Sequence, residues 1–356
     1  MKTILLAPTP PPAGGIASWT VRMQNTSLKN GWEVAVVDEK LIGNRDIFGN
    51  TKMSLIIEIK RCLKIWTQLW KSLNDPDAKI VHSNIPAGTT GMLREYVCAL
   101  ITKVRKRKFI IHYRCTIPNM VTSRFGLLIF RALTNKSDLV FALNSVSVEF
   151  VKKNSNTPVK LIPNFIEKND VVKEKTNISE KIQRVLYIGG VIESKGCLDI
   201  LEVAKEFPNI QFRLVGKTEA NILNMDKPSN VVLCGEKNKE EVKRELEEAD
   251  VFIFVSYFLG EGFSNALVEA MANGLPCIVS DWAANKDMIE ENGGFVVPIK
   301  DTQAIINALN KLIRDKSLRK IQSQWNINKV RNYYIDKIVT EMYVDAYENI
   351  LKEKVE

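Results

Sequence analysis

The chain has 356 residues, of which 45% are hydrophobic and 8% aromatic, so it is globular rather than disordered. This length is generous for one α/β core and comfortable for two domains. No apolar run approaches the roughly 18 residues of a membrane-spanning helix, and the short run before Pro8 is expected to be a first strand rather than a signal peptide.

The charge and the cysteines narrow the class of protein further. The net charge is +9, but residues 1–165 carry +14 and the remainder −5, which points to an anionic partner for the first half. No nucleic-acid motif is visible, so an anionic membrane surface or a lipid pyrophosphate fits that half better. Six scattered cysteines without a C-x-x-C pair, and only two histidines, predict no structural zinc or disulfide framework and favour a cytoplasmic protein.

The first half predicts a parallel sheet. Apolar strand-like runs cover residues 3–7, 33–38, 79–82, 109–113, 139–143 and 159–162. Gly14 and Gly15 follow the first run and allow close approach of a ligand, although a plain strand–helix turn explains them almost as well. His112 ends the fourth run, where ligands of open α/β sheets bind, and a structural role is equally compatible. The acidic pair around Pro76 is turn chemistry, and we expect no metal there.

Residues 52–73 predict a long amphipathic helix. Six large apolar residues recur in it at helical spacing: Leu55, Ile56, Ile59, Leu63, Trp66 and Trp70. Lysine and arginine lie between them, a composition typical of helices at a membrane surface. The simpler interpretation is a helix that packs on the sheet and keeps a solvated face.

The second half contains the most informative stretch. An apolar run at 251–256 predicts a buried strand, a loop with Gly260 and Gly262 follows, and Ser264 or Asn265 can cap the next helix. Free backbone N–H groups and a helix dipole at such a turn suit a phosphate. Two carboxylates, Glu261 and Glu269, flank the turn and suit sugar or ribose hydroxyls. The sequence therefore predicts a nucleotide-sugar site.

The stretch resembles the Glu-x7-Glu signature of family 4 glycosyltransferases, because E-G-F at 261–263, E-A-M-A at 269–272 and G-L-P at 274–276 are all in register. The resemblance implies the α/β fold called GT-B, with two Rossmann-like, doubly wound domains facing a central cleft and a C-terminal helix returning to the first domain. It implies an acceptor domain over 1–166 with the helix 333–356, a linker over 167–182, and a donor domain over 183–332. The I-P-N segment at 162–164 resembles the family's hinge between the domains.

The resemblance also implies the roles of single residues. Glu261, Lys195 and His112 would be catalytic: Glu261 on hydroxyls of the transferred sugar, Lys195 on the diphosphate, and His112 on the sugar from the first domain. The expected donor-binding residues are Gly14, Gly15, Gly189, Gly190, Gly262, Phe263, Ser264, Asn265 and Glu269, the last on the ribose. Gly190 stands where the family usually has an arginine, so one of two expected cations is missing, and Lys217 is a candidate to compensate.

The implied function is a retaining, metal-independent transferase that moves a sugar from a nucleoside-diphosphate sugar to a hydroxyl. It needs no cofactor, and its partners are the donor, a glycan or lipid-linked acceptor and an anionic membrane surface, with no nucleic acid. Surface-polysaccharide or lipid-linked glycan assembly is the expected context, on the inner face of the plasma membrane. Two alternatives stay open: a nucleotide-sugar epimerase of the same fold, and a catalytically weak nucleotide-sugar-binding protein.

Overall fold

The computed structural model describes residues 1–11, 14–40, 55–176 and 178–352. The chain divides into two compact units, the first formed by residues 1–164 and 336–356 and the second by residues 165–335. Three parts of the sequence predictions lie outside the described residues: positions 12 and 13 of the glycine loop, 52–54 of the amphipathic helix and 353–356 of the last helix.

The first unit is built on a parallel sheet. Within the described residues it has six strands in the order β2-β1-β3-β4-β5-β6. They are β1 (Lys2–Ala7), β2 (Glu33–Asp38), β3 (Ala78–Ile85), β4 (Lys108–Tyr113), β5 (Leu139–Ala142) and β6 (Val159–Leu161). The inner strands are buried along almost their whole length because helices cover both faces of such a sheet. The chain reverses direction across the sheet between β1 and β3, a switch point at whose carboxyl edge ligands bind.

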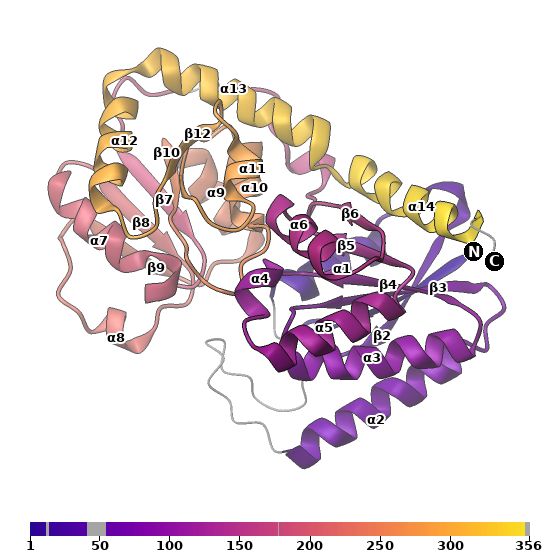
Figure 1. Ribbon diagram of the computed structural model, residues 1–356. Coiled ribbons are helices and arrows are strands. Elements are labelled where there is room, and N and C mark those ends of the chain that lie inside the picture. Colours follow the sequence, from indigo (N-terminus) through magenta and orange to yellow (C-terminus); the bar gives the residue numbers. More distant parts are fainter. Residues whose placement is uncertain (12–13, 41–54, 177, 353–356) are drawn as a thin grey trace. The chain divides into compact units, whose positions relative to one another are not determined.

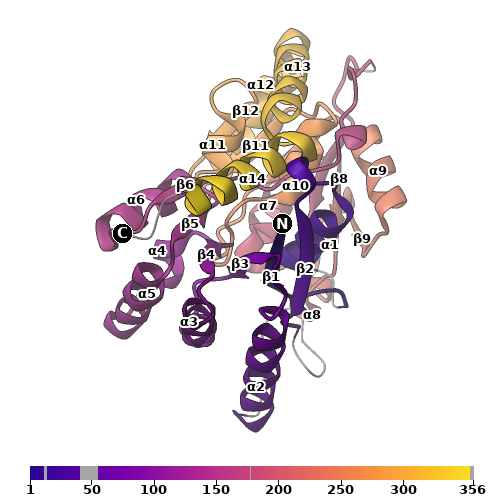
Figure 2. The same ribbon diagram turned by 90° about the vertical axis from the view of Figure 1, so that its right-hand side faces the viewer.

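Helices cover the two faces of this first sheet. They are α1 (Gly15–Asn25), α2 (Leu55–Ser72), α3 (Thr89–Val104), α4 (Ile117–Met120), α5 (Arg124–Lys136), α6 (Ser145–Asn154) and α14 (Asp336–Lys352), with a 3₁₀ turn η1 (Lys29–Gly31). Figure 2 shows α2, α3 and α5 side by side on one face and α14 on the other. Alternation along β3 agrees with this arrangement, since Ser83 bonds Glu95 of α3 while His82 bonds Tyr347 of α14.

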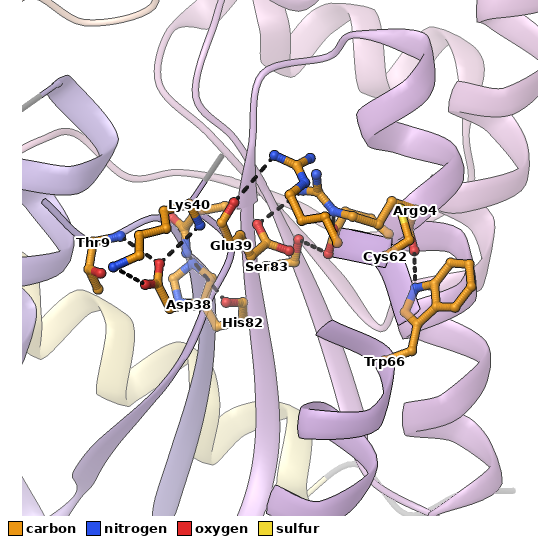
Figure 3. Close-up of polar contacts among 12 residues, drawn as sticks. Thr9, Asp38, Glu39, Lys40, Cys62, Trp66, His82, Ser83 and Arg94 are labelled. Carbon is orange, nitrogen blue, oxygen red and sulfur yellow. Dashed lines mark hydrogen bonds and ion pairs between the residues drawn. The ribbon is translucent and has the colours of Figure 1, made fainter. Parts of the chain in front are cut away.

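A buried charge network joins β2, β3, α2 and α3 (Figure 3). Arg94 of α3 bonds Glu39 at 3.0 Å and Glu95 at 2.7 Å, and Glu95 accepts a hydrogen bond from Ser83 at 2.7 Å. Arg61 of α2 reaches the same place, with its guanidinium 3.5 Å from the Glu39 carbonyl oxygen. Burial and the neighbouring Glu95 raise the pKa of Glu39 well above its usual range. The network fixes how α2 sits on the unit.

The second unit repeats the design. Within the described residues its parallel sheet has six strands in the order β12-β11-β10-β7-β8-β9. The strands are β7 (Arg184–Ile188), β8 (Gln211–Val215), β9 (Val231–Gly235), β10 (Val251–Phe254), β11 (Cys277–Ser280) and β12 (Gly294–Val297). The helices are α7 (Cys197–Glu206), α8 (Ala220–Leu223), α9 (Lys239–Glu248), α10 (Asn265–Ala272), α11 (Asn285–Ile289), α12 (Thr302–Arg314) and α13 (Lys316–Tyr333), with 3₁₀ turns η2 (Lys168–Asp170) and η3 (Glu193–Lys195). The predicted α/β class with two doubly wound sheets is confirmed.

The last helix, predicted over residues 333–356, begins later than predicted. The structure ends α13 at Tyr333 and begins α14 at Asp336, because Tyr334 and Ile335 pair with the incoming segment. The carbonyl oxygen of Tyr334 accepts from the amide of Ile166 at 3.0 Å, and Ile335 forms a parallel bridge with Ile166. The first and last residues of the second unit therefore run side by side.

The polar segment expected as a linker, residues 167–182, packs on the second unit. Arg319 of α13, which is 2% exposed, donates to the carbonyl oxygens of Ser179 at 2.6 Å and Glu180 at 3.2 Å. It also donates to the carbonyl oxygen of Leu312 at the end of α12.

No helix in the part of the chain that the structure describes is long and apolar enough to cross a membrane.

Candidate functional site

The candidate site of the second unit lies where its sheet reverses order. β7 and β10 are neighbours, and β7 also pairs with β8, so the switch point falls between β7 and β10. The loops after these two strands leave the same carboxyl edge of the sheet. They contain Gly189, Gly190 and Lys195 after β7, and Glu261 to Ser264 after β10. Ligands of doubly wound folds bind at this place.

Lys195 and Glu261 form an ion pair there. The Nζ–Oε2 distance is 2.5 Å, and the two side chains are only 19% and 11% exposed. The two loops are joined by their backbones as well, because the amide of Tyr257 donates to the carbonyl oxygen of Ser194 at 2.9 Å. Two predicted catalytic residues, 66 positions apart in the sequence, are thus brought together by the fold.

Aromatic rings surround the ammonium group of Lys195, and the sequence patterns did not predict them as part of the site. The Nζ of Lys195 lies 4.9 Å from the ring centre of Phe258 and 5.7 Å from that of Phe254. Such cation–π contacts hold an ammonium group without removing its charge. The carbonyl oxygen of Phe258 accepts from the indole of Trp282 at 2.8 Å. The sequence feature that could have indicated these rings is the pair of phenylalanines at the end of β10 and just before Glu261.

Two glycines of the β7 loop, Gly196 and Gly190, differ in whether the structure requires a glycine there. Gly196 has φ +77°, and a Cβ there would lie 2.3 Å from the carbonyl oxygen of Val255, so the close approach of the two loops requires it. Gly190 has no heavy atom within 4 Å of a built Cβ, and its φ lies outside the glycine region. A Cβ at position 190 would therefore meet open space.

The helix after the second loop begins as predicted. Ser264, rather than Asn265, caps α10, and its Oγ accepts from the amide of Leu267 at 3.2 Å. The preceding residues, Gly262 and Phe263, are buried in the loop, and the Phe263 ring packs edge-on against Tyr334 at 5.3 Å. Asn265 is the first residue of α10, and Glu269 lies within this helix, partly buried. The predicted residues from Glu261 to Glu269 therefore lie in one segment, from the ion pair to the middle of α10.

His112 of the first unit is placed differently from the expectation. It is 0% exposed, stacks on His82 with ring centres 5.4 Å apart, and meets Trp19 and Tyr343 edge-on or tilted. Burial and the nearby Arg114 lower the pKa of both histidines well below 6.5. In this structure His112 is therefore a neutral residue enclosed by its own unit, and its direct contact with a sugar stays a prediction.

Arg114 is the charged member of this enclosed cluster. Its guanidinium donates to Oδ1 of Asn164 at 2.6 Å, lies 3.3 Å from His112 and stacks over Trp19 at 4.5 Å. Asn164 ends the predicted hinge segment, and the boundary between the two units follows it. Gly14 and Gly15, by contrast, form the start of α1, with Gly14 at the N-cap.

Two further observations bear on ligands. Among the described residues, no group of three or more His, Cys, Asp or Glu side chains could hold a metal ion. An open hollow of about 610 Å³ lies on the second unit between α11 and β12, lined by residues such as Lys286, Asp287, Glu290 and Phe295. None of the predicted donor residues lines it, so the hollow is separate from the Lys195–Glu261 pair.

Solved structures of other proteins share the fold of this chain over nearly its whole length. The fold matches sucrose-phosphate synthase from Thermosynechococcus elongatus with a TM-score of 0.76 at 17% identity, over 99% of this chain and 100% of that one. It also matches Anabaena Alr3699/HepE in complex with UDP, with a TM-score of 0.76 at 15% identity, over 98% and 100% of the two chains. These likenesses show the fold, which is the GT-B fold that the sequence predicted.

Sequence similarity narrows the class. Residues 168–329 match the family model of glycosyl transferases group 1. The chain is 27% identical over 329 residues to UDP-Gal:alpha-D-GlcNAc-diphosphoundecaprenol alpha-1,3-galactosyltransferase from Escherichia coli, covering 81% of this chain and 82% of that protein. It is 26% identical to the capsular polysaccharide biosynthesis glycosyltransferase CapM of Staphylococcus aureus, over 51% of each. These similarities identify the chain as a glycosyltransferase, and the match to group 1 covers residues 168–329 of its second unit.

Proposed function

We propose that this glycosyltransferase is retaining and metal-independent, and that it moves a sugar from a nucleoside-diphosphate sugar to a hydroxyl of a lipid-linked glycan acceptor. The observation that supports donor binding is the Lys195–Glu261 ion pair at the switch point of the second sheet, shortly before the capped start of α10. A cation, a carboxylate and a helix N-terminus at one sheet edge suit a diphosphate with sugar hydroxyls beside it.

The ion pair suggests how the donor engages. A diphosphate that takes Lys195 as its counter-ion replaces the Glu261 carboxylate on the ammonium group. The freed carboxylate then accepts hydrogen bonds from hydroxyls of the transferred sugar, while Glu269 serves the ribose. The rings of Phe254 and Phe258 keep the ammonium at the site through the exchange.

The transfer itself breaks the bond between the anomeric carbon and the β-phosphate oxygen and forms one to the acceptor oxygen. The hydroxyl proton leaves with the departing nucleoside diphosphate. Lys195 stabilises the charge that develops on the phosphate, which is where preorganised cations contribute most to rate. A lipid-linked acceptor is supported by the Escherichia coli relative, whose name specifies a diphosphoundecaprenol acceptor. A uridine nucleotide is supported by the solved HepE complexes with UDP and UDP-glucose.

One observation favours a second candidate, a nucleotide-sugar-binding protein with little turnover. Position 190 offers space but no cation, so Lys195 bears the diphosphate charge without the usual arginine. Binding and turnover distinguish the two candidates, because a binding protein responds to the nucleotide sugar and releases no nucleoside diphosphate.

The test is a thermal-shift screen of the full chain against UDP-, GDP-, ADP- and CMP-sugars, followed by an assay of nucleoside-diphosphate release with and without a lipid-linked acceptor. We expect one nucleotide class to raise the melting temperature, as any ligand of the native state does. Acceptor-dependent release of that nucleoside diphosphate supports the transferase. A donor-only reaction that yields a free sugar isomer would instead identify an epimerase, and no shift with any nucleotide would refute the site.

A further inference from the structure

The helix α2 exposes the apolar residues that an ordinary covering helix would bury. Its buried positions are Arg61, Ile65 and Leu69. The large apolar residues predicted from helical spacing lie on the outside: Leu55 is 75% exposed, Ile56 64%, Ile59 52%, Leu63 52% and Trp70 44%. α2 therefore packs on the unit by Arg61, Ile65 and Leu69, and its solvated face carries the predicted apolar row, of which only Trp66 is partly buried.

The orientation of α2 about its own axis is fixed by polar contacts beneath it. Arg61 bonds Glu58 at 2.7 Å and approaches the Glu39 carbonyl oxygen at 3.5 Å. The indole of Trp66 donates to the carbonyl oxygen of Arg94 at 3.3 Å, and Figure 3 shows this bond between α2 and α3. The apolar row thus faces outward because the buried network holds the opposite side of the helix.

A basic row runs beside the apolar one. Lys60, Lys64 and Lys71 are exposed on α2, and Glu58, its acidic residue, is already paired with Arg61. Arg105, from the turn after α3, stacks over the exposed Trp70 with its guanidinium carbon 4.5 Å from the ring centre. Helical geometry places residues 60, 64 and 71 about 60–140° from residues 59, 63 and 70. The helix therefore has three sectors: buried, apolar and basic.

The neighbouring helices continue this surface. On α3, Leu93 is 41% exposed, Leu100 37% and Val104 69%. On α5, Phe125 is 59% and Leu128 62% exposed, with Arg124 and Arg131 exposed on the same helix. α2, α3 and α5 lie side by side on this face of the unit (Figure 2).

We propose that α2, with the exposed apolar residues of α5, lies in the headgroup region of an anionic lipid bilayer. This rests on the proposed function, because a lipid-linked acceptor has to be met at a membrane. Aliphatic residues and tryptophan beside lysines are the composition of interfacial helices, in which apolar side chains enter the acyl boundary and cations meet anionic headgroups. A nucleic acid would complement the cations and leave the isoleucines and leucines in water.

The test measures co-sedimentation of the full chain with vesicles of phosphatidylcholine mixed with phosphatidylglycerol, and with vesicles of phosphatidylcholine alone. We expect binding to the anionic vesicles, weakened by salt. Ile56→Ser with Ile59→Ser should weaken binding on the order of tenfold or more, because these side chains no longer gain from burial. Lys60→Glu with Lys64→Glu should weaken it by at least about fivefold for each lysine lost.

The matched control for the apolar pair comes from the second unit, and that for the charge reversal from α6 of the first. Ile321 is 63% and Leu223 55% exposed, close to the values of 64% and 52% for Ile56 and Ile59. Ile321→Ser with Leu223→Ser should leave vesicle binding unchanged. For the charge reversal, Lys152→Glu on α6, at an exposed lysine paired with Glu149, is the comparison.

Three results would overturn the proposal. They are no binding to anionic vesicles, equal loss of binding in the control variants, and a concentration-dependent dimer that the α2 substitutions abolish, which would make a second copy the occupant. A thermal-shift measurement with nucleotide and no vesicles tests the donor site separately. A protein that binds vesicles but no nucleotide would refute the proposed function alone, and the reverse pattern would refute only the membrane surface.

Discussion

At the scale of single residues, the Lys195–Glu261 pair has the clearest consequences. Both side chains are largely buried and each has the other as its charged partner. Such a pair has to exchange partners when a diphosphate arrives, so each residue affects the other's role.

Replacing Lys195 by alanine should lower kcat by on the order of 10²-fold or more, because the cation stabilises charge that develops on the leaving phosphate. The measurement is steady-state release of the nucleoside diphosphate. Lys205→Ala on α7, where the ammonium group pairs with Glu202 at the surface, is the control and should leave kcat unchanged. Equal kcat in both variants would remove Lys195 from the mechanism.

Position 190 allows the opposite experiment, a gain of function. The Cβ of Gly190→Arg would meet open space, and the guanidinium should add a second cation for the diphosphate, raising kcat/KM by about tenfold. Gly196→Ala is the matched glycine in the same loop, and its Cβ would clash with the carbonyl oxygen of Val255, so it should cost more than about 2 kcal/mol of unfolding free energy. Reduced nucleotide binding in Gly190→Arg would show that this position does not face the diphosphate.

At the scale of elements, buried polar contacts hold segments that are far apart in the sequence. The best example is Arg319, which joins α13 to the end of α12 and to residues 179–180. A segment with the composition of a linker is thereby fixed on the second unit.

Arg319→Ala should destabilise the second unit by about 2–4 kcal/mol, because several buried carbonyl oxygens lose their donor. Chemical denaturation of the full chain measures this loss. Lys320→Ala, at the next and exposed position, should change the unfolding free energy by less than about 0.5 kcal/mol. A similar small change in both variants would contradict the role given to Arg319.

The enclosed histidines of β3 and β4 predict a pH dependence of stability. The pKa values of His82 and His112 are well below 6.5 in the folded state, so the unfolded chain takes up protons first as pH falls. Stability should be unaffected above about pH 7 and should fall below about pH 6.5, by up to about 1.4 kcal/mol per pH unit for each histidine.

The measurement is the unfolding free energy at several pH values between about 5 and 8. His82→Phe should reduce the slope below pH 6.5 by the share of one histidine, because phenylalanine takes up no proton. An unchanged slope would mean that His82 is already protonated, or exposed, in the folded protein.

At the scale of the whole molecule, the last helix belongs to the first unit. α14 supplies Tyr343 and Tyr347, both fully buried against the sheet, and Tyr347 bonds His82 at 2.7 Å. Burial raises the pKa of Tyr343 to about 12, so its hydroxyl stays neutral in this layer. The first unit is therefore completed only by the final residues of the chain.

Deleting residues 336–356 should unfold the first unit, since two buried tyrosines worth several kcal/mol of packing are lost together. Limited proteolysis followed by mass spectrometry should show cleavage within residues 1–164, with the second unit protected. Tyr347→Phe, which keeps the ring and removes one hydrogen bond, should cost only about 1 kcal/mol. A protease-resistant first unit in the deletion variant would contradict this assignment.

The sequence by itself determined the α/β class, the strands of the first sheet, the strand before Glu261, and the Glu261–Glu269 stretch with its capped helix. Those features depend on local patterns: apolar runs, glycines at turns and a serine before a helix. The ion pair of Lys195 with Glu261, the enclosure of His112 and the outward apolar row of α2 were decided by the tertiary structure. Helical spacing gives the relative angles of side chains but not which side faces the sheet, and for α2 Arg61 with its buried partners set that choice.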